Sequence, residues 1–228
     1  IEETMNHLPK NSSKPIILSI AGNSTEEYLH ALKAIVEHKN AQYVDAIEVN
    51  CSCPTMGYAP LAYSLDALRL LFNGIEKLGP TKPLWFKLSP YFTAEYFTEL
   101  RERYSKYDFG GCPVIAESFM DDLLKLLKDY TGIISAIIIS NGLPQVSRGA
   151  DIQVELSEGV VRTVAGLSGP ALKAGNIKTI RYMKANGLAV DIIGCGGVLT
   201  KQDIIDYVDS GAAAVQCVGG PIWGDGIA

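Results

Sequence analysis

Short apolar runs alternate along the chain with segments whose apolar residues recur every three or four positions. Runs of about four to eight apolar or β-branched residues indicate buried strands, and the longer periodic segments indicate amphipathic helices. The runs that predict strands are residues 16–21, 44–51, 84–88, 133–139, 190–194 and 212–218. Strands that alternate with helices require a parallel sheet with helical crossovers, so we predict an α/β fold.

The expected helices begin and end at residues that commonly cap helices. Ser24 is followed three residues later by Glu27, and Thr200 is followed by Asp203, so both pairs are typical of a capping box. Between 143 and 165 no helical period is present, and the alternation over 151–164 predicts a hairpin excursion. The helices are expected over residues 24–38, 66–78, 93–100, 117–130, 170–184 and 200–208.

The number of strands leaves two architectures open. A closed (β/α)8 TIM barrel contains eight strands, whereas only six βα units are visible in this chain. The chain therefore forms either an open doubly wound sheet, or a barrel whose first two strands precede Ile1.

Composition and charge exclude several classes of function. A hydrophobic content of 47% and a charged content of 20% are typical of a soluble globular protein. The net charge of -5 argues against a nucleic-acid or anionic-membrane surface, and no apolar run reaches the ~20 residues that span a bilayer. Five cysteines, an odd number, indicate reduced thiols in a cytoplasmic protein. None of the three histidines follows a strand, so neither a histidine triad nor a metal site is expected.

Polar and glycine residues collect after the predicted strands, at the end where α/β barrels place their active sites. Two consecutive glycine turns follow the last two strands, and such turns let backbone N–H groups approach a phosphate. The alternative is that they are only tight turns between strand and helix. The residues concerned are Asn50, Ser52, Cys53, Lys87, Ser140, Asn141, Gly196, Gly197, Gly219 and Gly220.

Cys53 and Lys87 are the two candidates for chemistry, and each has a simpler interpretation. Cys53 is either a buried filler or a thiolate base, and a Cys51-x-Cys53 metal site lacks a second ligand pair. Lys87 lies between apolar residues. It either extends to solvent, or it provides a cation beside an electron-rich cofactor ring or a substrate.

Five segments in order resemble the dihydroorotate dehydrogenase family, class 1, and most closely class 1A. They are EVNCSCP at 48–54, FKLSPYF at 86–92, GLSG at 166–169, GCGGV at 194–198 and AVQ at 214–216. The resemblance implies one FMN-binding (β/α)8 barrel domain over residues 1–228, incomplete at both ends. The two missing strands would precede Ile1 and the final helix would follow Ala228.

The resemblance also implies roles for individual residues. Cys53 would be the base that removes a proton from C5 of dihydroorotate, while the hydride from C6 passes to FMN and yields orotate. Asn50, Ser52, Thr55, Ser140 and Asn141 would contact the substrate. Residues expected at FMN are Asn50, Lys87, Ser168, Gly169, Cys195, Gly196, Gly197, Gly219 and Gly220. Class 1A further implies fumarate as electron acceptor and a cytoplasmic homodimer in pyrimidine biosynthesis.

Three departures from the family pattern leave alternatives open. Thr55 stands where the family commonly has asparagine, and Ser140-Asn141 is the reverse of the family's Asn-Ser pair. A second alignment places the apolar residues 137–138 at that pair instead, and the turn at 218–221 differs from the usual Gly-Thr-Ala. The alternatives are a related flavin barrel that acts on another dihydropyrimidine, or an inactive paralogue that serves as a binding module.

Overall fold

The computed structural model describes the 228-residue chain except residues 54–59, 148–153, 157–159, 163 and 219–228. Six strands form one sheet in the order β1-β2-β3-β4-β9-β10. The pairs β1–β2, β2–β3, β3–β4 and β9–β10 are parallel, which confirms the predicted α/β class. These strands are β1 Ile17–Ile20, β2 Ala46–Asn50, β3 Leu84–Lys87, β4 Ala136–Ile139, β9 Asp191–Cys195 and β10 Ala214–Gln216.

Helices α2 to α7 follow the expected order, with boundaries that move by a few residues, whereas the short helix α1 was not expected. In the described part of the chain, no helix is both long and apolar enough to cross a membrane. The α-helices are α1 Glu2–Asn6, α2 Thr25–Val36, α3 Leu65–Leu78, α4 Ala94–Arg103, α5 Glu117–Asp129, α6 Pro170–Ala185 and α7 Lys201–Asp209, with 3-10 turns at Ala41–Tyr43 and Leu61–Tyr63.

The chain forms two compact units, each assembled from separated segments. The first contains Ile1–Leu88, Leu123–Ile138 and Leu188–Asp191, and the second contains Ser89–Asp122, Ile139–Gly187 and Ile192–Ala228. The expectation of a single domain over 1–228 stays a prediction.

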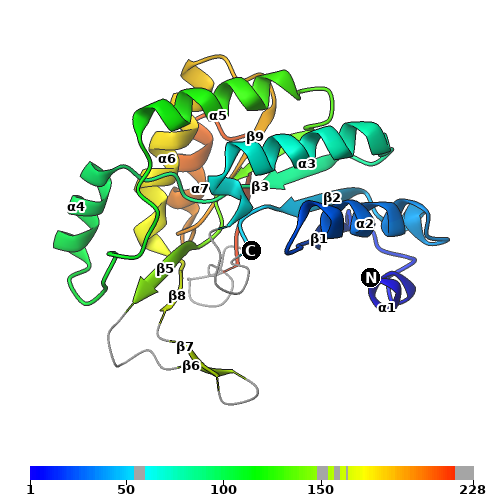
Figure 1. The fold of residues 1–228 in the computed structure, drawn as a ribbon, viewed down its shortest axis with the longest axis horizontal. Coiled ribbons are helices and arrows are strands. Elements are labelled where there is room, and N and C mark those ends of the chain that lie inside the picture. The colour runs from blue at the N-terminus through cyan, green and yellow to red at the C-terminus, as the bar shows by residue number, and fades with distance from the viewer. Residues whose placement is uncertain (54–59, 148–153, 157–159, 163, 219–228) are drawn as a thin grey trace. The chain divides into compact units, whose positions relative to one another are not determined.

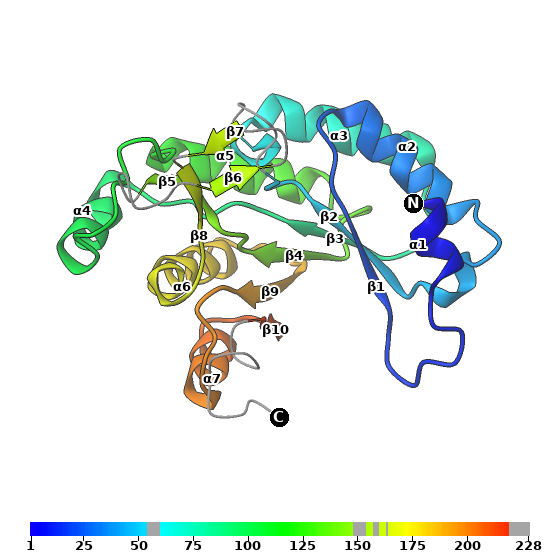
Figure 2. The ribbon, with the colours of Figure 1, turned by 90° about the horizontal axis from the view of Figure 1, so that it is seen from below.

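In the first unit, helices α2 and α3 lie side by side and cover one face of β1 to β3 (Figures 1 and 2). Each helix turns an apolar stripe inward, as its spacing predicts. The covered sheet face includes Ile47, Val49 and Phe86, none of which is exposed to solvent. Side chains that alternate with these three therefore project from the opposite face of the sheet.

In the second unit, α4 packs on α6 through an aromatic cluster that includes Phe92, Tyr96 and Phe97. The hydroxyl of Tyr96 donates to the carbonyl of Ala171 at 3.0 Å. Gly175 of α6 permits the close approach, because a Cβ there would lie 2.3 Å from a ring carbon of Phe92. The cluster holds the first turn of α6 in place.

An antiparallel hairpin lies within the excursion expected at about 143–165. β6 (Val154–Leu156) pairs antiparallel with β7 (Val160–Arg162). A second antiparallel pair joins β5 (Leu143–Ser147) to β8 (Val164–Leu167), with an irregular register between Leu143 and Val146. The sequence did not indicate this pair, because the irregularity interrupts the alternation that identifies a strand.

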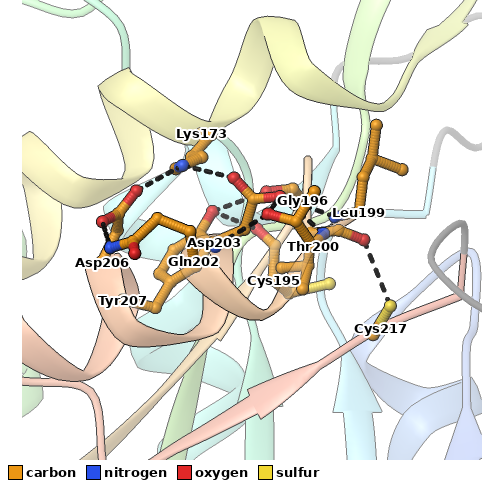
Figure 3. A network of polar contacts seen from close by, with 11 residues as sticks. Lys173, Cys195, Gly196, Leu199, Thr200, Gln202, Asp203, Asp206, Tyr207 and Cys217 are labelled. Carbon is orange, nitrogen blue, oxygen red and sulfur yellow. Dashed lines mark hydrogen bonds and ion pairs between the residues drawn. The ribbon is translucent and has the colours of Figure 1, made fainter. Parts of the chain in front are cut away.

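Helices α6 and α7 are joined by a charged network that Figure 3 shows from close by. The ammonium of Lys173 contacts the carboxylates of Asp203 and Asp206. Asp203 also accepts hydrogen bonds from the backbone of Leu199 and Thr200, which confirms the capping box predicted at Thr200. Burial alone would raise the pKa of Asp203, but the bonds from Lys173, Leu199 and Thr200 outweigh it and lower the pKa to about 2.

Substitution of Gly194 in β9 can test how tightly the sheet packs on α7. A Cβ at this position would lie 2.3 Å from a ring carbon of Tyr207, which is fully buried. We therefore expect Gly194→Ala to lower the free energy of unfolding by about 1 to 3 kcal/mol in urea denaturation, since an overpacked core must shift. Gly132→Ala is the control, because no atom lies within 4 Å of its Cβ position. Equal stability of the two variants would contradict this packing.

The lowered pKa of Asp203 predicts a specific dependence of stability on pH. Its carboxylate stabilises the fold above the unfolded-state pKa of 3.8, and this contribution is lost as the pH falls toward about 2. At pH 7, Asp203→Asn should lower the free energy of unfolding by about 1 to 2 kcal/mol, because water screens part of the pair. The difference from the parent should shrink between about pH 4 and pH 2. Asp209→Asn, an exposed position of the same helix, should change little.

Candidate active site at the strand ends

The polar strand residues of the first unit project from the sheet face opposite α2 and α3. Ser19 of β1 is opposite Glu48 of β2, and Asn50 of β2 is opposite Lys87 of β3. Side chains two positions apart on a strand point to the same side, so these four polar groups share one face. The parallel register thus gathers groups that lie far apart in the sequence near the carboxyl ends of three strands.

Lys87 forms an ion pair with Glu48. Its ammonium lies 3.4 Å and 3.5 Å from the two carboxylate oxygens, and the side chains are 17% and 7% exposed respectively. Ser19 Oγ donates to the same carboxylate at 2.8 Å. Lys87 therefore does not extend to solvent. Sequence reasoning missed Glu48, although its position two residues before Asn50 indicates the shared face.

Asn50 is held on both its backbone and its side chain. The hydroxyl of Tyr28 donates to the Asn50 carbonyl at 2.6 Å, and the Asn50 amide oxygen accepts from the backbone N–H of Ser52 at 3.2 Å. Burial, followed by the nearby thiol of Cys51, raises the pKa of Tyr28 well above its usual range, so the phenol remains a neutral donor. The chain is thereby fixed just before Cys53.

Cys53 borders a cavity of about 330 Å³ in the first unit. The walls come from the segment after β1 and from the first turns of α2 and α3, with Ser24, Tyr28 and Ser64 among the lining residues. Cys51 differs sharply, because it is fully buried and burial raises the pKa of its thiol far above the usual range. Of these two thiols, only Cys53 can reach a bound molecule.

In the second unit, two of the predicted glycine turns touch. Gly169, the N-cap of α6, has φ +99°, and Gly196 and Gly197 after β9 have φ +105° and +72°. Side chains disfavour this left-handed region. A Cβ at Gly197 would also lie 2.9 Å from the carbonyl oxygen of Gly169. Glycine is therefore required for both the turn conformation and the close approach.

Two side chains that the sequence did not single out support the turn after β9. Asn176 of α6, which is fully buried, donates from Nδ2 to the Cys195 carbonyl at 2.7 Å. Tyr207 of α7 donates to the Gly196 carbonyl at 2.7 Å (Figure 3). Both lie inside amphipathic helices, where the sequence pattern cannot distinguish a buried polar contact from a core position.

Ser140 also supports the turn after β9. Its backbone N–H donates to the Cys195 carbonyl at 3.0 Å, and its buried hydroxyl donates to Asn176 Oδ1 at 3.0 Å. Asn141 Oδ1 accepts from the N–H of Gly142 at 2.7 Å. The two residues of the alternative alignment, Ile137 and Ile138, are fully buried. A substrate contact by Ser140 or Asn141 stays a prediction.

The candidate site residues therefore fall into three groups. The first unit contains Asn50, Ser52, Cys53 and Lys87 at or just after the ends of β2 and β3. The second unit contains Ser140, Asn141, Ser168, Gly169, Cys195, Gly196 and Gly197. Thr55, Gly219 and Gly220 lie outside the described residues.

Known sequences resemble this chain along almost its whole length. A catalytic subunit of dihydroorotate dehydrogenase B (NAD(+)) from Malacoplasma penetrans is 29% identical over 220 residues, 94% of this chain and 60% of that protein. A dihydroorotate dehydrogenase A (fumarate) from Limosilactobacillus reuteri is 27% identical over 207 residues, 89% of this chain and 55% of that protein. The chain thus spans somewhat more than half the length of these relatives.

A solved structure supports the fold. The crystal structure of DHODH in complex with ferulenol from Eimeria tenella matches 94% of this chain and 51% of its own chain, with a TM-score of 0.58 and 19% identity. This likeness agrees with the predicted fold class, part of a (β/α)8 barrel. The dihydroorotate dehydrogenase family profile matches residues 1–112 and 112–227. With both halves of the sequence matched in this way, the protein belongs to the dihydroorotate dehydrogenase family.

Proposed function

We propose that this protein oxidises (S)-dihydroorotate to orotate with FMN, a step of de novo UMP biosynthesis. The observation that supports this most directly is the accessible thiol of Cys53 in a cavity just after β2. Asn50 and Lys87 lie opposite each other on the adjoining strands. The family resemblance implies a base at Cys53, an amide at Asn50 and a cation at Lys87, all near strand ends.

Cys53 acts as the general base in this proposal. Its thiolate removes the proton from C5 of dihydroorotate, and the cavity gives the sulfur access to the substrate. Asn50 orients the pyrimidine through its side-chain amide. The bond from Ser52 holds that amide, and the bond from Tyr28 holds the Asn50 backbone near the carboxyl end of β2. Ser52 and Thr55 belong to the same proposed substrate segment.

The glycine turns of the second unit fit a phosphate group. Gly169, Gly196 and Gly197 have positive φ and carry no side chain, and α6 begins at Gly169 without a side-chain cap. Backbone N–H groups at such a helix start favour an anion. We propose that Ser168, Gly169 and the Cys195–Gly197 turn hold the FMN phosphate, together with Gly219 and Gly220. When bound, FMN supplies the acceptor for the C6 hydride, and Lys87 places positive charge beside its ring.

The electron acceptor defines the class of the enzyme. We propose fumarate and a cytoplasmic homodimer, as the resemblance to class 1A implies, and the L. reuteri relative carries fumarate in its name. The M. penetrans relative is named for NAD(+), so an NAD-linked enzyme is the competing class. Reoxidation of the reduced flavin by fumarate, and not by NAD+ in the presence of candidate partner subunits, supports the proposed class.

A related dihydropyrimidine is the alternative substrate. The observation that favours it is the position of the Ser140 hydroxyl, which donates to Asn176 in the second unit. A substrate with fewer hydrogen-bonding groups than orotate would not need that hydroxyl. Reduction by dihydrouracil but not by dihydroorotate would select this alternative, and reduction by neither would favour an inactive paralogue.

The flavin spectrum tests the proposed function directly. We expect the purified protein to bind FMN and its visible absorbance to bleach when dihydroorotate is added without oxygen, because the hydride reduces the flavin. The matched control is orotate, which has no hydride to give. A protein that does not bind FMN, or whose flavin dihydroorotate leaves oxidised, contradicts the proposal.

Replacement of the base gives a second test. Cys53→Ser should slow flavin reduction by about 10²- to 10⁴-fold at neutral pH, the range expected for loss of a general base. The rate should recover as the pH rises, because a hydroxyl is far less acidic than a thiol. Cys217→Ser, at another partly buried thiol, should retain the parent rate. A Cys53→Ser rate within a few-fold of the parent would place the base elsewhere.

A further inference from the structure

We propose that Glu48 is a positioning residue that fixes the Lys87 ammonium and partly neutralises it, and thereby sets the reduction potential of the bound flavin. This inference rests on the proposed function, because it requires FMN beside Lys87.

The contact of Glu48 with Ser19 and Lys87 joins three strands. The Glu48 carboxylate accepts a hydrogen bond from Ser19 Oγ at 2.8 Å. Its two oxygens also lie 3.4 Å and 3.5 Å from the Lys87 ammonium. The three residues belong to adjacent strands in continuous parallel register. The carboxylate is therefore held by rigid elements, and it restrains a lysine side chain that would otherwise sample many rotamers.

Glu48 also acts on Lys87 through its charge. Two unit charges interact more strongly in a partly buried site than in water, and here the side chains are only 17% and 7% exposed. Paired with Glu48, Lys87 presents a reduced positive field. Without the carboxylate, the full ammonium charge would act on a group beside it and would favour the anionic reduced flavin.

Stability alone gives a weak reason for this ion pair. The desolvation of two buried charges offsets most of their Coulomb attraction, so a buried ion pair adds little to folding. The pair nevertheless lies on the same sheet face as Asn50, the last residue of β2, which is opposite Lys87. Its placement points to the control of a charge near the site.

The test is the midpoint potential of the FMN-loaded protein, measured by equilibration with reference dyes. Glu48→Gln keeps the size of the side chain and an acceptor for Ser19 but removes the charge. We expect its flavin potential to shift to a more positive value, with the FMN dissociation constant within about threefold of the parent. Ser19→Ala is the matched control, because it removes the hydrogen bond but leaves both charges, and its potential should remain close to the parent value.

A double-mutant comparison identifies Lys87 as the intermediary. Lys87→Met should shift the potential to a more negative value. In that background Glu48→Gln should have a smaller effect, because the carboxylate no longer has an ammonium to position. An equal positive shift in both backgrounds, or no shift in either, would overturn the proposal.

Two further outcomes separate this inference from the proposed function. If Glu48→Gln does not fold, Glu48→Asp provides the same test. It withdraws the carboxylate from Lys87 and should give a smaller positive shift, and an unshifted potential overturns the inference. A parent protein that binds no FMN contradicts the proposed function, whereas an unshifted potential in a variant that dihydroorotate still reduces contradicts only the role of Glu48.

Discussion

The parallel register of β1, β2 and β3 is the constraint on which the candidate active site of the first unit depends. It places Ser19 opposite Glu48 and Asn50 opposite Lys87. Because side chains alternate across a sheet, the same register buries the intervening apolar residues against α2 and α3. A slip by one residue would move the polar groups into the core and the apolar groups to the site.

Burial assigns different chemistry to two cysteines that are two residues apart. Cys51 lies within the core, where a thiolate would lose its solvation, and the raised pKa of its thiol keeps it protonated. Cys53 follows the strand end and borders the cavity. The fold thus leaves the second thiol accessible to a substrate, and the tyrosine that fixes Asn50 also fixes the chain from which Cys53 projects.

The glycine turns of the second unit depend on buried polar side chains for their shape. Glycine adopts positive φ without strain, but it does not by itself hold a turn in one conformation. Asn176 and Tyr207 hold the turn after β9 by its carbonyl oxygens, and Lys173 with Asp203 ties the two helices that provide them. Both helices begin beside glycine turns, so the network that stabilises the helix pair also maintains the shape of the predicted phosphate site.

The sequence by itself determined the order of the six strands of the main sheet and of helices α2 to α7, the parallel class of the sheet and the family motifs, because periodicity and turn residues are local signals. The tertiary structure alone decided which partner a polar residue meets. The sequence could not identify Glu48 as the partner of Lys87, because their contact joins different strands. It could not identify Asn176 either, because this residue lies within an amphipathic helix. Hydrogen-bond partners depend on register and on helix packing, and both are set by contacts between residues far apart in the chain.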